Sequence, residues 1–424
     1  MNNDMNEIEK EKEFLNFGAL PHELIVEILL RLPVRSLVRF KSVCTAWRSL
    51  ISNPQFGKSH FDLAASPTHR LLRERFNNFD ISEIESFDLK ASLHDDSAVV
   101  NLKFPPHSGT YIKALGSCRG FIMLTSPKLG DLILWNPSTG AHKEIPATYV
   151  DWDSWYDPST STHVRRGIPP YFAGLFFDPL SGFGYDQSKD DYLLVIIRLG
   201  VVCEPRVKFS LPRIEVVSLI TNVPSFYYVD VEYQEMLIGY ESLCGIFFDK
   251  SLHWLVKSKA TWLHAVIAFD LVERSLSEIP LSPDLAAALA TYERGYLRVL
   301  GGCLSVCYSS GGRHGHEVAE IWVMKDYKVQ SSWTKSFVLT IHGLVNDMNF
   351  FPMFFTEGGG VFGLDESGTY KKFDDDGELL ETYEDRLGRR QSALRYFDMY
   401  RESILTLPEL AALPDDFVEE NEDA

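Results

Sequence analysis

The sequence predicts a small all-α module followed by a large all-β domain, most simply a β-propeller. Between residues 20 and 54, apolar side chains recur at the spacing of amphipathic helices. Beyond about residue 72, short segments rich in Val, Ile, Phe, Trp and Tyr alternate with Gly, Pro, Asn and Asp, as strands alternate with turns. One strand–turn–strand pattern also recurs after 134 residues, about three times the length of a propeller blade.

Length and composition fit this division. A chain of 424 residues is expected to hold two or three domains, or one small module and one large all-β domain. Hydrophobic residues make up 45% and charged residues 24%, as in ordinary globular proteins. We predict a disordered N-terminus over 1–16, a helical module over 17–60, a connector over 61–84, the β-domain over 85–405 and an acidic tail over 406–424.

Three short helices are expected in the module. The first has an apolar stripe between residues 24 and 32. The second is expected after Pro33 with Ser36 as its N-cap, and the third begins at Thr45 and ends before Pro54. A module of about 40 residues is near the lower size limit for an independent core. Its surplus apolar surface is therefore expected to meet another protein.

The residues of this module resemble an F-box, the segment by which a substrate receptor docks on the Skp-type adaptor of a cullin-RING ubiquitin ligase. The matching text is Leu20-Pro21-x-Glu23-Leu24, then 28–34, then 37–44, then Trp47. The resemblance implies that the adaptor contacts are Leu20, Pro21, Ile28, Leu29, Leu32, Val43, Cys44 and Trp47. Trp47 is the expected anchor because large aromatics tend to dominate interface energetics. An ordinary three-helix fragment of a larger core is the alternative interpretation.

Charge is unevenly distributed along the chain. The formal net charge of −18 disfavours general binding to nucleic acid. Residues 20–61, however, hold six Lys or Arg and two acids, a local balance of +4. A basic rim around an apolar face would steer an acidic adaptor, although a merely solvated face is equally compatible with the pattern.

The sequence also bears on the cellular compartment. Residues 1–12 lack the apolar core of a signal peptide, and no apolar run approaches the ~18 residues of a membrane helix. The six cysteines are scattered and form neither a disulfide framework nor paired C-x-x-C motifs. We expect a protein of the cytoplasm, the nucleus or both, with reduced thiols and no membrane partner.

The β-domain is expected to consist of repeated strands. Strands are predicted over 131–135, 192–198, 214–220, 265–269, 297–306 and 320–324, and one further helix over 283–292. In the repeat, eleven positions separate Trp135 from Pro146 and Phe269 from Pro280. Residues 85–405 would then form roughly six or seven blades.

Several motifs of the β-domain resemble the F-box-associated interaction domain of plant F-box proteins, many of which are described as F-box/kelch-repeat proteins. The motifs lie at 117–121, 134–139, 182–186 and 320–327. Kelch character is partial, because Gly301-Gly302, Tyr308 and Trp322 form one kelch-like set that is not repeated cleanly. The resemblance implies a kelch-like propeller that presents loops to a partner and performs no chemistry.

Candidate catalytic and metal-binding patterns are incomplete. His314 and His316 lack nearby cysteines, whereas a structural zinc site needs four ligands. Cys303 and Cys307 lie in a β pattern and are interpreted as buried structural thiols. The run 374–377 lacks the other carboxylates of a calcium loop and is expected to form a hairpin turn. We expect no catalytic residue, no metal and no cofactor.

The sequence thus predicts a non-enzymatic receptor subunit of an SCF-type ubiquitin ligase. Its expected partners are a Skp-type adaptor, through it the cullin and RING subunits, and an unidentified protein target. The expected target contacts lie in an irregular aromatic segment and comprise Trp152, Trp155, Tyr156, Arg165 and Arg166. A second aromatic segment, 225–233, is a weaker candidate. The alternatives are a propeller-type enzyme, a small-ligand-binding protein, and an F-box scaffold without turnover.

Overall fold

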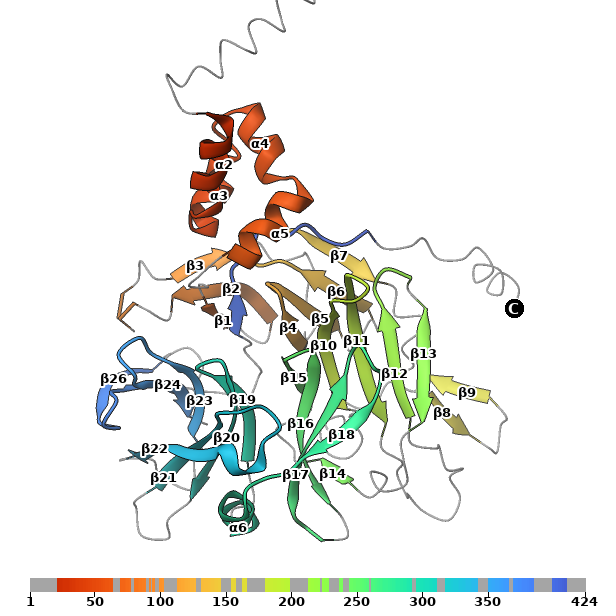
Figure 1. Cartoon of the computed structure of the whole chain (residues 1–424), viewed down its shortest axis with the longest axis vertical. Coiled ribbons are helices and arrows are strands. Elements are labelled where there is room, and N and C mark those ends of the chain that lie inside the picture. Colours follow the sequence, from red (N-terminus) through yellow and green to blue (C-terminus); the bar gives the residue numbers. More distant parts are fainter. Residues whose placement is uncertain are drawn as a thin grey trace, which may run out of the picture. The chain divides into compact units, whose positions relative to one another are not determined.

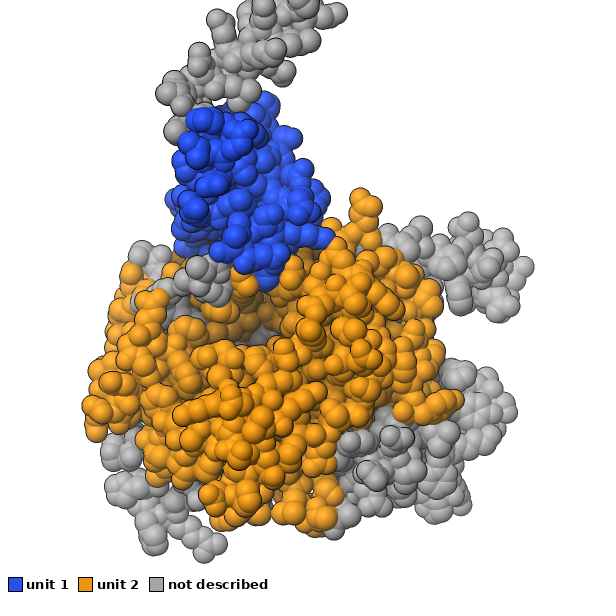
Figure 2. Space-filling view, viewed as in Figure 1, with its two compact units in different colours: residues 1–68, 402–406 blue, residues 69–401, 407–424 orange. Residues whose placement is uncertain are grey.

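The described part of the chain divides into two compact units, which Figure 2 colours separately. In this computed structural model the described residues are 21–63, 69–77, 80–88, 91–92, 94–95, 99–102, 113–126, 131–145, 154–157, 162–165, 180–198, 213–221, 223–228, 236–238, 244–258, 261–291, 295–310, 317–341, 350–365, 369–384 and 399–409. The first unit contains 21–63 and the segment Glu402–Thr406, and the second contains the rest.

The first unit contains the three predicted helices, α2 (His22–Leu30), α3 (Val34–Phe40) and α4 (Thr45–Ile51). The predicted start of α3 is wrong, because Pro33 and not Ser36 occupies the N-cap position. The carbonyl oxygen of Pro33 accepts hydrogen bonds from the backbone N–H groups of Ser36 (2.9 Å) and Leu37 (3.2 Å). Ser36 therefore lies inside the first turn.

A fourth helix, α5 (Pro54–Leu63), begins where the third was expected to end the module. Asn53 caps it, since its Oδ1 accepts hydrogen bonds from the backbone N–H groups of Gln55 (2.8 Å) and Phe56 (3.4 Å). Asparagine at the N-cap followed by proline at the first helical position is a favoured start. The predicted connector over 61–84 is therefore wrong, because α5, β1 (His69–Asn77) and the beginning of β2 (Asp80–Asp88) occupy much of it.

The second unit consists mainly of β-strands (Figure 1). After β1 and β2 come β3 (Val99–Leu102), β4 (Lys113–Cys118), β5 (Phe121–Ser126), β6 (Asp131–Trp135), β7 (His142–Ile145), β8 (Ser154–Asp157), β9 (Thr162–Arg165), β10 (Leu180–Asp186), β11 (Asp191–Arg198), β12 (Arg213–Ser218), β13 (Pro224–Tyr228), β14 (Met236–Ile238), β15 (Cys244–Phe248), β16 (Ser251–Ser258), β17 (His264–Asp270) and β18 (Leu276–Ile279). The remainder are α6 (Pro283–Thr291), β19 (Gly295–Leu300), β20 (Cys303–Ser310), β21 (Glu317–Met324), the 3-10 turn η4 (Gln330–Ser332), β22 (Trp333–Ile341), β23 (Phe350–Phe355), β24 (Val361–Asp365), β25 (Thr369–Phe373), β26 (Leu379–Glu384) and β27 (Met399–Arg401).

These strands form repeated four-stranded antiparallel units, the arrangement of a propeller-like fold. Four units are separate sheets: β27-β1-β2-β3, β4-β5-β6-β7, β19-β20-β21-β22 and β23-β24-β25-β26. Two more, β10–β13 and β15–β18, are joined by a short parallel pairing of β10 with β15, and β14, which pairs with β16, completes a nine-stranded sheet. The predicted all-β domain is confirmed, with β8 and β9 forming a separate two-stranded hairpin among the described strands.

The first and last strands of the second unit meet in one sheet. β27 pairs with β1, with Arg70 opposite Tyr400, and Figure 1 shows this blue C-terminal strand beside β1. Arg70 is only 1% exposed. Its guanidinium donates to Ser86 Oγ (2.5 Å), Ser86 O (3.0 Å) and Asp88 Oδ2 (3.2 Å), and Ser86 Oγ is 2.9 Å from the Tyr400 hydroxyl. One buried arginine thus links the strands that close the domain.

The repeat found in the sequence is a repeated turn. In the β6–β7 turn, Asn136 Oδ1 accepts hydrogen bonds from the N–H groups of Ser138 and Thr139. In the β17–β18 turn, Asp270 Oδ1 accepts from Val272 and Glu273. Such side-chain-to-backbone bonds are typical of Asx turns. The predicted relation between the two segments is therefore confirmed at the level of geometry.

A second recurring turn was hidden in the sequence. Gly301 and Gly302 both have positive φ (57° and 76°) and connect β19 directly to β20, so the single strand predicted over 297–306 is in fact a hairpin. Arg119-Gly120 and Asp249-Lys250 form equivalent two-residue turns with positive φ. A two-residue hairpin turn with both φ values positive matches the right-handed twist of the strands. The β-domain thus repeats the geometry of these turns, although their sequences do not repeat as a kelch motif would.

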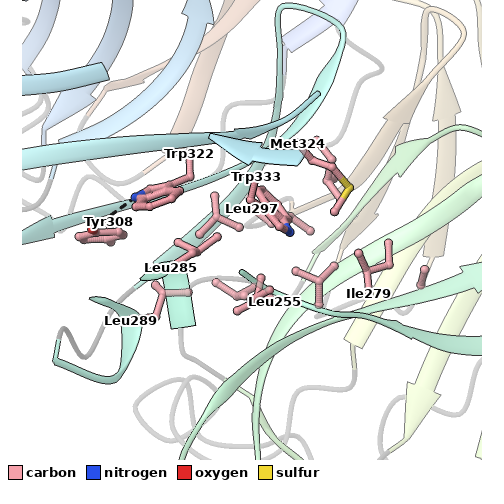
Figure 3. Packing of buried hydrophobic residues seen from close by; sticks show 14 residues of the cluster. Leu255, Ile279, Leu285, Leu289, Leu297, Tyr308, Trp322, Met324 and Trp333 are labelled. Carbon is pink, nitrogen blue, oxygen red and sulfur yellow. Dashed lines mark hydrogen bonds between the residues drawn. The ribbon is translucent and has the colours of Figure 1, made fainter. Parts of the chain in front are cut away.

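Helix α6 covers an apolar cluster between two four-stranded units (Figure 3), which confirms the helix predicted over 283–292. Leu285 and Leu289 are fully buried in a cluster with Leu297, Trp322 and other side chains. Trp333 Nε1 donates to Pro280 O at 3.1 Å. The helix therefore fills space that a strand-to-strand connection alone would leave empty.

A buried histidine joins the β15–β18 and β19–β22 units. His253 is 0% exposed, and its Nδ1 lies 3.2 Å from Ile246 O, while Nε2 lies 2.7 Å from the Tyr327 hydroxyl. A carbonyl oxygen can only accept, so Nδ1 carries the proton and Nε2 accepts from Tyr327. Burial lowers the pKa of His253 to about 4 and raises the pKa of Tyr327 to about 12.

This histidine gives the stability a pH dependence. Between pH 6.5 and about 4 the unfolded chain binds a proton at His253 that the native state excludes, so stability falls as the pH falls through this window. The full contribution is about 3 kcal/mol. In denaturant unfolding, His253→Gln should flatten this fall, whereas His142→Gln, at an exposed position, should leave it unchanged. An equal fall in both variants would contradict the assignment.

Candidate functional site

The predicted adaptor contacts lie mainly on the helical unit, and several of them are exposed apolar side chains. Ile28 on α2 is 47% exposed and Val43, before α4, is 54% exposed. Leu24, which the prediction did not include, is 44% exposed on the same helix as Ile28. Pro21 is exposed and precedes α2, whereas Leu20 lies outside the described residues. Exposed apolar side chains gathered on so small a unit are typical of an interaction surface.

Trp47 is held in place by its own helix start. Cys44 is the N-cap of α4, and its Sγ accepts a hydrogen bond from the backbone N–H of Trp47 at 3.4 Å. The indole packs against the ring of Phe40, with centroids 5.2 Å apart. Trp47 is half-buried, so one part of the indole is fixed by the unit and another part remains exposed. A pre-ordered aromatic loses little entropy on binding.

Leu29 has a different role from the one predicted. It is 1% exposed and belongs to the core of the helical unit, together with Leu37, Ile51 and Phe56. Leu32 is half-buried and packs against the same core. The burial of Leu29 argues against the predicted contact with a partner, because its side chain is already enclosed by the helical unit. Leu29 supports the surface from beneath.

Basic side chains lie on the same helices as these apolar side chains. The guanidinium of Arg48 donates from Nε to Lys41 O at 3.2 Å, which joins α3 to α4 on the exposed side. Burial lowers the pKa of Lys41. Arg39 is exposed, and Arg31 forms only a 3.6 Å surface pair with Glu27. Exposed Arg39 and Arg48 thus give α3 and α4, the helices on either side of Cys44, the cations that a rim would need.

The aromatic segment predicted to contact a target is a hairpin where the structure describes it. Trp155 and Tyr156 lie on β8, and Arg165 lies on β9, with Ser154 opposite Arg165. These residues form paired strands, so the irregular conformation predicted for them is wrong. Trp152 and Arg166 lie outside the described residues, as does Tyr233 of the second aromatic segment.

The described part of the second aromatic segment, 225–228, lies on the outer strand β13. Phe226 is 58% and Tyr228 is 81% exposed, whereas Tyr227 between them packs against Phe269 with centroids 6.3 Å apart. The Arg213 guanidinium lies over the Phe226 ring at 5.7 Å and pairs through Nε with the buried Glu215 at 2.7 Å. The alternation that defines a strand places two aromatics and one cation on the exposed face.

Two family comparisons agree with this division of the chain. An F-box domain matches residues 17–59, and an F-box associated beta propeller domain matches residues 75–372. The chain is an F-box protein of the F-box-associated β-propeller family. Both predicted resemblances are confirmed.

Relatives of this F-box protein include plant proteins. An F-box/kelch-repeat protein of Arabidopsis thaliana is 28% identical over 364 residues, covering 82% of this chain and 86% of the relative. The Arabidopsis F-box protein CPR1 is 26% identical over 342 residues, covering 76% of this chain and 73% of CPR1. The two family matches and these F-box relatives support a substrate-adaptor role of the kind typical of SCF complexes.

Within the described ranges, this F-box protein has no group of three or more His, Cys, Asp or Glu side chains that could hold a metal ion. Cys303 and Cys307 are free thiols, and burial raises the pKa of Cys307 to about 12. The predicted turn at 374–377 is confirmed, since Asp374 N–H donates to Glu378 O (3.0 Å) and Gly377 has a φ of 86°. His314 and His316 lie outside the described residues. None of the helices that the structure describes is long and apolar enough to span a membrane.

Proposed function

We propose that this protein is the substrate-recognition subunit of an SCF-type ubiquitin ligase. The observation that carries the proposal is an exposed apolar surface on the F-box unit, with Ile28, Val43 and the half-buried Trp47, in a chain whose second unit is an F-box-associated β-domain. The F-box would bind a Skp-type adaptor and through it the cullin and RING subunits. The β-domain would bind the target for ubiquitination and degradation.

The mechanism is one of proximity. Because one chain carries both binding surfaces, the target is held near the ubiquitin-charged enzyme and its lysines reach a high effective concentration. The catalytic residues belong to other subunits, so this chain has to provide only affinity and position. The cationic rim formed by Arg39 and Arg48 would accelerate association with an acidic adaptor and would make it sensitive to salt.

Trp47→Ala tests the adaptor side. We expect wild-type protein to co-purify with a Skp-type adaptor and the variant to lose about 2 kcal/mol or more of binding free energy, as at a buried hot spot. Trp262→Ala is the matched control, because Trp262 is 62% exposed on the β-domain. It should bind like the wild type. Calorimetric titration with purified adaptor gives the dissociation constants.

Failure would be unambiguous. If folded wild-type protein bound no adaptor, the ligase assignment would be wrong. If Trp47→Ala bound as tightly as the wild type while retaining its fold, Trp47 would not be the anchor, and the contact would have to depend on Ile28 and Val43.

We propose two target contacts, the exposed face of β13 and the β8–β9 hairpin with its flanking residues Trp152 and Arg166. Phe226, Tyr228 and Arg213 support the first, since exposed aromatics beside a cation suit an acidic, extended segment of a target. The hairpin contributes Trp155, Tyr156 and Arg165.

Protein levels in plant cells test the β13 contact. Proteins depleted by the wild type and by the control Leu379→Ala/Leu380→Ala should be retained with Phe226→Ala/Tyr228→Ala. Depletion of the same proteins by the β13 variant would exclude that contact. We also propose cytoplasmic or nuclear residence, in keeping with the five described cysteines that are free thiols. Entry of a fluorescent fusion into the secretory pathway would contradict it.

A further inference from the structure

A short segment from the far end of the chain belongs to the F-box unit. Glu402–Thr406 groups with the helices and not with the β-domain that precedes it (Figure 2). It lies outside both family matches, which end at residues 59 and 372. Ser403, Ile404 and Leu405 are 1%, 2% and 6% exposed, so the segment is enclosed although it forms neither helix nor strand.

The segment completes the apolar core of the helices. Ile404 clusters with Leu29, Leu37 and Phe56, the residues on which α2, α3 and α5 pack. Gly57 on α5 allows a close approach, because a Cβ at that position would lie 3.3 Å from Ile404 O. An apolar side chain more than 340 positions from α5 therefore fills the same core.

An ion pair orients the segment. Arg35 Nε of α3 lies 3.3 Å from Glu402 Oε1, and the Glu402 side chain is only 6% exposed, while that of Arg35 is 40% exposed. A carboxylate enclosed to this degree is costly unless it is paired. Arg35 thus favours one placement of the segment on α3.

We propose that Glu402–Thr406 is an integral element of the adaptor-binding module beside the four described helices, and that these helices become competent for the adaptor only when this segment has docked. The proposal rests on the proposed adaptor binding. Four short helices bury little apolar surface, so the loss of Ile404 from the core is a large fraction of what holds them together. Leu29 and Leu37 support the adaptor surface from beneath, so a loosened core displaces Ile28 and Trp47 as well.

The proposal has a consequence for synthesis of the chain. The helices leave the ribosome before the β-domain and Glu402 leaves after it, and domains generally fold in the order of their synthesis. An unfinished chain would therefore carry an incomplete F-box core. The adaptor would then select full-length receptors, whose β-domain has been made.

The test uses full-length protein with Ile404→Asp and its control Thr406→Asp, which alters an exposed position two residues away. Hydrogen exchange measures amide protection in the core of the helical unit, and calorimetric titration measures the affinity for the adaptor. We expect Ile404→Asp to lower amide protection in α2 and α5 about tenfold or more and to weaken adaptor binding to a similar extent. Protection in β4–β7 should be unchanged, and the control should resemble the wild type.

A milder pair guards against general misfolding. Arg35→Ala removes the ion-pair partner of Glu402, while Gln55→Ala changes an exposed residue of α5 that lies outside the proposed adaptor contacts. Only Arg35→Ala should speed exchange in 402–406 and weaken adaptor binding. Undiminished protection of α2 and α5 in Ile404→Asp would overturn the proposal. Loss of protection in a protein whose wild type binds no adaptor would instead retain the segment as part of the core and refute the proposed function.

Discussion

Arg70→Ala is expected to lower the free energy of unfolding by about 3–5 kcal/mol, one of the two largest effects in the β-domain. The substitution leaves a cavity where a fully buried side chain stood. It also removes three hydrogen bonds that reach Ser86 and Asp88 on β2. Ser86 in turn contacts Tyr400 on β27, so the damage falls on the sheet that joins the two ends of the domain. Urea unfolding followed by tryptophan fluorescence gives the difference.

Arg298→Ala is the matched control for Arg70. Arg298 lies half-buried on β19, and its guanidinium bonds to the neighbouring carbonyl of Leu297 at 3.0 Å. We expect a loss of about 1 kcal/mol or less. Hydrogen exchange should also localise the Arg70→Ala effect to β1, β2 and β27. Equal losses in the two variants would show that closure does not depend on the buried arginine.

Asp186→Ala is expected to cost about 3–5 kcal/mol as well, because it leaves Arg274 without its anion. The Asp186 carboxylate is 0% exposed and lies 2.8 Å from Arg274 Nη2, which joins the β10–β11 turn to the β17–β18 turn. Its Oδ1 also accepts hydrogen bonds from the backbone N–H and the hydroxyl of Ser188, at 2.9 and 2.6 Å. Thermal and denaturant unfolding measure the loss.

Two further variants sharpen this prediction. Glu273→Ala changes an exposed acid next to Arg274 and should alter stability by no more than about 0.5 kcal/mol. The double variant Asp186→Leu/Arg274→Met removes both charges and should recover part of the loss, as apolar replacements of buried ion pairs do. A double variant less stable than Asp186→Ala would argue that the turn hydrogen bonds dominate.

The sequence predicts the helix boundaries of the first unit well where the spacing of apolar residues and the positions of proline indicate the same boundary. Thr45 begins a helix and Pro33 separates two, as expected. It does not predict α5, because that helix is mostly polar and only Phe56 and Phe61 mark its buried face as apolar, beside Gly57 and His60. Its stability comes from tertiary packing of Phe56, His60 and Phe61, which periodicity within one segment does not reveal.

The roles of individual residues on α2 were harder to predict. Ile28 and Leu29 are adjacent and equally apolar, yet one is 47% and the other 1% exposed. A helix that is apolar over most of its circumference does not disclose which stripe faces its own core and which faces a partner. The answer depends on α5 and Ile404, and the latter lies far away in the sequence.

The all-β class of the second unit was predictable from the sequence, but the repeat of its four-stranded units was not. Its units share turn geometry, while the turn residues differ from Gly301-Gly302 to Arg119-Gly120 to Asp249-Lys250. A lysine or arginine with positive φ is costly in isolation and is tolerated where the flanking strands fix the turn. Residue identity therefore understated the symmetry of the domain, and the closure by β27 left no local signal at all.

Strand β13 gives this architecture a capacity for divergence. Tyr227 is committed to packing against Phe269, while Phe226 and Tyr228 on either side face outward. Substitutions at these alternate positions change the exposed surface without altering the volume of the core. Two descendants of one gene could therefore acquire different targets through a few changes on outer strands while keeping the same folding requirements.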